Sequence, residues 1–270
     1  MNNNFRPAAV AGAFYPESAA VLARDVGQML ADAADTKMAA QPKAIIAPHA
    51  GYIYSGPIAA SVYAPLAALR GTIRRVVLLG PTHRVAVNGL ALPSCAAFVT
   101  PLGMVPIDGQ AIASIEDLPQ VVLSDAAHAL EHSLEVQLPF LQAVLGDFSL
   151  LPLAVGHVSA EAVAEVLERL WGGDETLIVI SSDLSHYLPY DVARRTDAVT
   201  AAHITALDPQ INHQQACGAT PVNGLLLAAR RHGLLARQID LRNSGDTAGD
   251  KSRVVGYGAF TFTDGAHNVD

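Results

Sequence analysis

The sequence predicts an α/β fold in which a mostly parallel central sheet is flanked by helices. Short, almost continuously apolar runs such as 75–80 and 176–180 alternate with segments whose apolar residues recur at helical spacing. Strands that are apolar on both faces are typical of parallel sheets covered by helices on both sides. Because the chain has 270 residues, a length at which an α/β fold commonly stays in one piece, we expect one domain over residues 1–270, with its core at about 6–262.

The expected elements follow in order along the chain. Residues 17–35 repeat apolar side chains at the spacing of one helix face, and a strand is expected at 43–47. Ser55 and Pro57 then offer an N-cap and an early-turn proline to a helix that runs to Leu69. Further strands are expected at 75–80, 150–155, 176–180, 238–241 and 254–262. Further helices are expected at 133–145, 160–171, 191–207 and 221–231.

Composition excludes several classes of partner. The formal net charge is -8 and Lys and Arg do not cluster, which argues against nucleic acid and anionic membranes. No apolar run approaches the roughly 18 residues of a membrane span, and the amino terminus lacks the pattern of a signal peptide. Cys95 and Cys217 form no CxxC pair, so a disulfide framework is not indicated. We therefore expect a cytoplasmic protein whose partner is a small molecule.

Chemically capable side chains follow four of the expected strands. In open α/β sheets, ligands bind in the crevice beyond the carboxyl ends of the strands. The residues at these positions are His49, His83, Asp183 with His186, and Asp246. Two histidines and a carboxylate form the facial triad of non-haem Fe(II) enzymes, so His49, His83 and Asp246 would supply the metal ligands. His186 would stay unligated and act as general acid or base, although each histidine taken alone also fits an ordinary loop or capping role.

Six sequence blocks carry a resemblance to a known family. They are Phe14-Tyr15-Pro16, APHAGYIYSG at 47–56, GPTH at 80–83, EHSLEVQLPF at 131–140, SSDLSHY at 181–187 and NSGD at 243–246. In this order they resemble the Memo family, whose bacterial and archaeal members are called AmmeMemoRadiSam system protein B. The resemblance extends from about Arg6 to Phe262, and several blocks in one order are more specific than any single motif.

The resemblance implies a fold related to the class III extradiol dioxygenases of the LigB type, with a metal pocket for iron or copper. It matches His49 and His83 to metal-binding histidines and His186 to the catalytic base of the dioxygenase relatives. The animal Memo protein uses a cysteine as third ligand, and our alignment places Asp246 there. Because a carboxylate with two imidazoles suits Fe(II), we expect iron first and copper or zinc as alternatives. Association with radical-SAM and AMMECR1-type proteins is implied by the family only.

Other interpretations stay open at this point. His128-Ala129-Leu130-Glu131-His132 matches the H-x-x-E-H pattern of zinc metallopeptidases, in which the glutamate acts as base. A metal- or peptide-binding module without turnover is a further alternative to a dioxygenase-like oxidoreductase. Residues expected to line the pocket or to support its ligands are Tyr54, Glu131, His132, Asp183 and Cys217. Their residue types suit hydrogen bonding to a ligand or to a substrate, or simple packing.

Overall fold

Four parallel strands form the centre of the main sheet, as the apolar runs predict. We describe a computed structural model of the chain over residues 4–36 and 40–265. The central strands lie in the order β2 (Pro42–Ala47), β9 (Thr176–Ser181), β3 (Arg75–Pro81) and β8 (Ser149–Val155). All three of their pairings are parallel, so these four strands end at the same edge of the sheet.

The outer strands make the sheet mixed. On one side, β12 (Val254–Asp264) runs antiparallel to β2 and also pairs with β11 (Leu234–Asn243) and β10 (His186–Leu188). On the other side, β4 (Leu90–Leu92) is antiparallel to β8 and parallel to β7 (Val121–Leu123). The parallel arrangement therefore holds for the centre of the sheet, and most pairings outside it reverse direction.

Helices cover both faces of the main sheet. One face packs against α1 (Ala19–Asp32), α2 (Tyr52–Tyr63) and α5 (Leu138–Leu145). The opposite face packs against α3 (Gly109–Ala113), α6 (Ala160–Arg169), α7 (Tyr190–Thr205) and α8 (Ala219–Arg231). The neighbouring residues Val77 and Leu78 of β3 pack on opposite faces, because successive side chains of a strand point to opposite sides of the sheet. Leu78 belongs to the core under α1, α2 and α5, and Val77 belongs to the core under α3, α6, α7 and α8.

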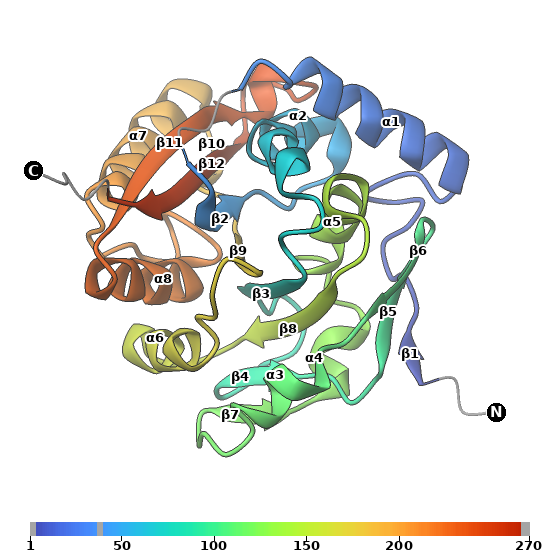
Figure 1. Ribbon diagram of the computed structural model, residues 1–270. Helices are drawn as coiled ribbons and strands as arrows, with labels where there is room; N and C mark the ends of the chain where they lie inside the picture. The colour runs from blue at the N-terminus through green and yellow to red at the C-terminus, as the bar shows by residue number, and fades with distance from the viewer. Residues whose placement is uncertain (1–3, 37–39, 266–270) are drawn as a thin grey trace, which may run out of the picture.

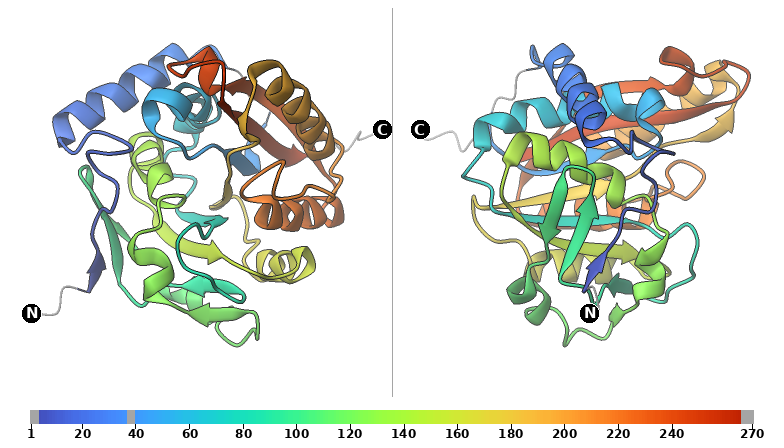
Figure 2. Two further views of the ribbon diagram at one scale, coloured as in Figure 1. Left: turned by 180° about the vertical axis from the view of Figure 1, so that it is seen from behind. Right: turned by 90° about the vertical axis from the view of Figure 1, so that its right-hand side faces the viewer.

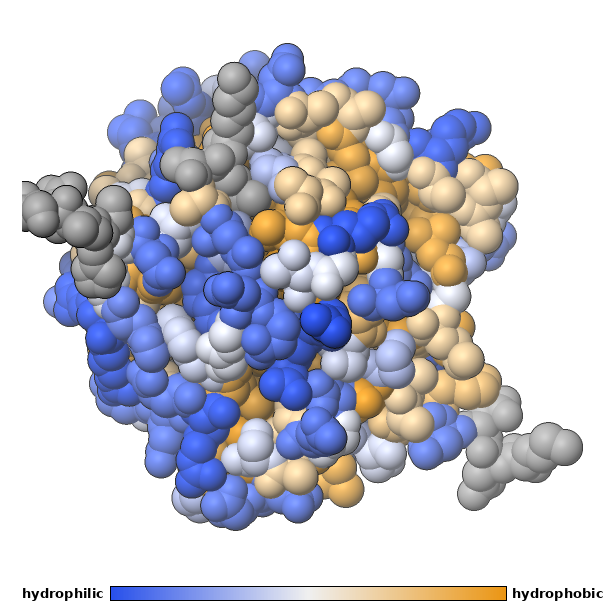
Figure 3. All heavy atoms as spheres, viewed as in Figure 1, coloured by the Kyte–Doolittle hydropathy of each residue, from blue (hydrophilic) through white to orange (hydrophobic). Residues whose placement is uncertain are grey.

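A second, three-stranded sheet lies beside the main one. It contains β1 (Phe5–Arg6), β5 (Ala97–Thr100) and β6 (Gly103–Pro106) in the order β1-β5-β6. Figures 1 and 2 show these strands next to α5, away from α6, α7 and α8. In Figure 3 the surface is mostly polar over these three helices, whereas apolar residues are exposed toward α1 and β6.

The start of α2 differs from the sequence prediction. The helix begins at Tyr52, directly after Gly51, and Pro57 lies inside it. Tyr52 donates its N–H to the carbonyl oxygen of Phe14, and the Ser55 hydroxyl donates to Ala50 O and does not cap the helix. The consequence is that the helix amino terminus lies only three residues after His49. No helix in the described ranges is both long and apolar enough to cross a lipid bilayer.

Candidate metal centre

His49 lies two residues beyond the end of β2 and is 1% exposed. Its backbone N–H donates to Asp183 Oδ1 at 2.7 Å, and its ring Nδ1 lies 2.9 Å from Ser181 Oγ. The Ser181 hydroxyl donates its single hydrogen to the Ser133 carbonyl at 2.6 Å, so its oxygen must accept from Nδ1. Burial, together with the neighbouring histidines, lowers the pKa of His49 well below its usual range. The ring is therefore neutral and keeps a lone pair on Nε2.

His83 lies two residues beyond the end of β3 and is held by Glu131. Its backbone N–H donates to Glu131 Oε2 at 2.6 Å, and its Nδ1 donates to Oε1 at 2.8 Å. Burial would raise the pKa of Glu131, but the hydrogen bonds from His83 and Ser133 outweigh it and lower this pKa to about 2. The carboxylate accepts from Nδ1 and so selects the tautomer of the neutral ring in which Nε2 of His83 holds the lone pair.

His132 comes from the segment between α4 (Asp125–Ala129) and the short helix η2 (Glu135–Gln137). Its backbone N–H donates to Glu131 Oε1 at 2.9 Å, and its ring Nδ1 lies 3.3 Å from the same oxygen. Burial lowers the pKa of His132 to about 4, so the ring is neutral at neutral pH. On its other side the ring packs against Phe14, with 4.6 Å between ring centroids.

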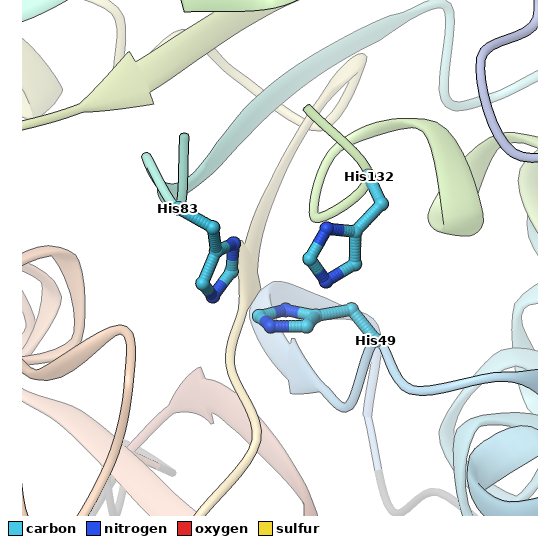
Figure 4. Close-up of side chains that lie close together, drawn as sticks. All are labelled: His49, His83 and His132. Carbon is cyan, nitrogen blue, oxygen red and sulfur yellow. The ribbon is translucent and has the colours of Figure 1, made fainter. Parts of the chain in front are cut away.

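The three histidines converge. Their ring centroids are 5.2 Å apart for His49 and His83, 5.4 Å for His49 and His132, and 4.5 Å for His83 and His132. One ring nitrogen from each lies within 4.8 Å of the others, and within the described ranges no second such group occurs. Figure 4 shows the rings facing one another from three separate segments. Neutral imidazoles with Nδ1 engaged by the protein are suitable metal ligands, and the set fits zinc, copper, iron or nickel.

Asp246 does not join this group, which corrects the predicted ligand set of His49, His83 and Asp246. It lies in the short helix η3 (Ser244–Asp246), which follows β11, and β12 separates β11 from β2. Its Oδ2 accepts from the backbone N–H of Asn243 at 3.0 Å, and its Oδ1 accepts from the Tyr190 hydroxyl at 2.5 Å. The carboxylate therefore caps a helix on the exposed surface, and His132, which we expected only to line or support the pocket, lies in the third position.

His186 faces the same cavity as the three histidines. The cavity has a volume of about 600 Å³ and is also lined by Tyr54, Asp183 and Tyr187. Nδ1 of His186 donates to the Leu184 carbonyl at 2.8 Å, which leaves the lone pair on Nε2. Burial lowers the pKa of His186, so this ring is also neutral at neutral pH.

Asp183 and Cys217 lie behind His49. Burial raises the pKa of Asp183 to about 7, despite the hydrogen bonds that it accepts from the backbone at His49 and Ala50. The Cys217 sulfur lies 3.3 Å from Nε2 of His49, and burial raises the pKa of this thiol to about 12. Cys217 is therefore a protonated thiol that can donate to His49, and it lies outside the group of three converging histidines.

His128 lies away from the metal centre. Its helix α4 ends at Ala129, before Glu131 and His132, so the two histidines of the H-x-x-E-H pattern do not share a helix face. Nε2 of His128 donates to the Ala91 carbonyl at 2.8 Å, and burial lowers the pKa of His128 to about 4. The geometry removes the basis of the zinc-metallopeptidase interpretation.

Comparison with known proteins gives one family. A family model described as Memo-like protein matches residues 6–261. A MEMO1 family protein of Aquifex aeolicus is 38% identical over 270 residues, covering 95% of this chain and 98% of that protein. A MEMO1 family protein of Ignicoccus hospitalis is 36% identical over 283 residues, with the same two coverages. Among solved structures, an uncharacterized protein of Escherichia coli K12 is similar over 80% of this chain and 98% of that one, with a TM-score of 0.47 and 14% identity.

Proposed function

The chain belongs to the Memo-like protein family, and from this premise we propose that it binds one transition-metal ion on His49, His83 and His132 and oxidises a small molecule in the adjoining cavity. The observation that carries the proposal is the convergence of three imidazole rings, with one nitrogen of each close to the others. Nδ1 of His49 and His83 is engaged by a hydrogen bond, so each Nε2 keeps its lone pair, and at His49 an ion would replace the Cys217 thiol as the partner of that lone pair. Three protein ligands leave further coordination positions open, which is typical of catalytic and not structural metal sites.

Iron is the ion that we propose first. Without Asp246 the donor set no longer favours a hard ion, because imidazole alone suits zinc, copper, iron and nickel. Iron therefore rests on the family resemblance, and copper and zinc are its rivals. When bound, the ion supplies Lewis acidity and, if it is iron or copper, one-electron redox chemistry.

The residues of the chain would bind the substrate and move its proton. A cavity of about 600 Å³ is in the size range of small-molecule sites, which agrees with a small-molecule partner. The neutral ring of His186 presents Nε2 as a proton acceptor, and the Leu184 carbonyl holds the ring in this orientation. Asp183 lines the same cavity and exchanges its own proton near pH 7.

Elemental analysis after anaerobic purification tests the metal site. We expect one equivalent of metal in the wild type and large losses in His49→Ala, His83→Ala and His132→Ala. Two matched controls, His128→Ala and Asp246→Ala, remove a histidine and a carboxylate outside the site and should keep the metal. Metal that persists without His49 and His132, or that leaves with His128, would overturn the site.

Oxygen consumption tests the reaction. A panel of small phenolic and catechol-like compounds should include one that consumes O₂ with the metal-loaded wild type but not with His186→Gln. A loaded protein that consumes no O₂ with any of them would favour the metal- or peptide-binding module. A cytoplasmic location and association with radical-SAM and AMMECR1-type proteins stay proposals, to be tested by cell fractionation and co-purification.

A further inference from the structure

We propose that Arg6 and Glu135 are positioning residues of the metal centre. They hold residues 128–135, which carry Glu131 and His132, in the place from which both side chains reach the site. Neither residue lines the cavity or belongs to the converging histidines, so any effect on metal binding must pass through their neighbours. The inference rests on the proposed metal site. It implies that the amino-terminal strand β1, which contains Arg6, helps to hold that site in place.

Arg6 binds residues 128–135 at three points. Its Nε donates to the His128 carbonyl at 2.7 Å, its Nη2 to the Glu131 carbonyl at 2.6 Å, and its Nη1 to Glu135 Oε2 at 2.6 Å. The residue is only 6% exposed, and its guanidinium lies over the ring of Phe98 at 4.8 Å. A planar guanidinium can serve three acceptors in fixed directions, which a lysine ammonium on its flexible stem cannot do.

Glu135 accepts hydrogen bonds from residues 9–15, which we call the amino-terminal segment. Its Oε1 accepts from the Val10 N–H at 3.0 Å and from the Tyr15 hydroxyl at 2.5 Å. Its Oε2 accepts from the Ala9 N–H at 2.8 Å as well as from Arg6. The carboxylate is fully buried, and a buried ion pair is tolerated only where such additional hydrogen bonds satisfy both charges.

These contacts reach the metal ligands through Glu131 and Phe14. Arg6 holds the carbonyl of Glu131, while the side chain of Glu131 accepts from His83 and from the backbone of His132. Phe14 belongs to the segment that Glu135 holds, and its ring packs on His132. If the amino-terminal segment loosened, Glu131 and His132 would lose a fixed position, whereas His49 would keep its own bonds to Asp183 and Ser181.

Arg6→Lys is the variant that tests this role. Lysine keeps a positive charge beside Glu135, but it lacks the planar guanidinium that donates to the carbonyls of His128 and Glu131 at the same time. We expect the variant to bind Zn(II) about 10 to 100-fold more weakly than the wild type in a chelator competition, since this is the usual cost of losing an outer support of a metal ligand. Arg75→Lys is the matched control, because Arg75 pairs with Asp108 at 2.7 Å outside the site and should leave the affinity unchanged.

A double-mutant cycle separates positioning from general loosening. Arg6→Lys is measured alone and in the His132→Ala background, with Cu(II) as the probe because it binds such ligands most tightly. If Arg6 acts through Glu131 and His132, its effect should be smaller in that background, where only the path through Glu131 to His83 remains. An equal loss in both backgrounds, or no loss in the single variant, would overturn the positioning role. Should Arg6→Lys not fold, Glu135→Gln takes its place in the same cycle. A wild type that binds neither Zn(II) nor Cu(II) would refute the proposed function itself, and with it this inference.

Discussion

Replacement of Glu131 by glutamine tests how much the hydrogen bonds of this residue stabilise the histidine cluster. The carboxylate accepts four N–H groups, namely the backbone and Nδ1 of His83 and the backbone of His132 and Ser133. Three of these donors share Oε1, and the His83 backbone N–H uses Oε2 at 2.6 Å. Glutamine has one oxygen, so its amide nitrogen would face the His83 N–H, and two donors would oppose each other.

The size of the effect follows from the acidity of Glu131. Its pKa is lowered from 4.5 to about 2, and each factor of ten in acidity corresponds to 1.36 kcal/mol, so the native state favours the ionised form by about 3 kcal/mol. Glutamine resembles the protonated form. We therefore expect Glu131→Gln to lower the free energy of unfolding of the metal-free protein by about 3 kcal/mol at pH 7.

Urea unfolding at several pH values measures this effect. A carboxylate whose pKa is lowered on folding stabilises the protein fully above pH 4.5, and this stabilisation is lost as the pH falls toward 2. The difference in the free energy of unfolding between wild type and Glu131→Gln should therefore become smaller over that pH range. Glu116→Gln, a change at an exposed glutamate, should stay within about 0.5 kcal/mol of the wild type. A loss below about 1 kcal/mol for Glu131→Gln, or a gap that does not narrow in acid, would refute the reasoning.

Three other predictions follow from the site and its surroundings. His186→Gln should keep the metal but lower turnover by about 10² to 10⁴-fold, measured as O₂ uptake, if His186 moves the proton; unchanged turnover would exclude that role. Asp246→Ala should keep the metal and lower the free energy of unfolding in urea by about 1 kcal/mol, because the cap of η3 and the bond to Tyr190 are lost; loss of metal would restore Asp246 as a ligand. His128 has its pKa lowered to about 4, so the metal-free protein should lose stability as the pH falls from 6.5 to 4, and His128→Gln should weaken this dependence in unfolding curves; an unchanged slope would show that His128 titrates normally.

The sequence predicts the centre of the fold well because burial leaves a strong pattern there. Strands β2, β3, β8 and β9 are covered on both faces, so their residues form nearly continuous apolar runs. In contrast, β4, β6 and β7 have only three or four residues, too few for a period to be recognised, and their partners decide their structure. β11 was expected only at 238–241, because charged residues such as Arg237 interrupt it, yet it extends over Leu234–Asn243.

The sequence could predict only those site residues that directly follow the carboxyl ends of the central parallel strands, where α/β sheets bind ligands. His49 and His83 follow parallel strands that end at the same edge of the sheet, and the structure brings these two residues together. Asp246 also follows a strand, but β12 separates that strand from β2. His132 follows no central strand, and Arg6, more than 120 positions away in the chain, holds the neighbouring carbonyl of Glu131. Such long-range contacts leave no local pattern in a single sequence.

Anchoring of the histidine rings by Ser181 and Glu131 has a consequence for the choice of ion. The anchored set presents only imidazole nitrogens, a donor type that suits zinc, copper, iron and nickel alike, and affinity for such ligands rises from manganese through iron and nickel to copper. Occupancy then reflects the supply in the host as much as the preference of the chain. The same protein produced in copper-rich and in iron-rich medium should therefore carry different metals, although the three histidines are the same in both preparations.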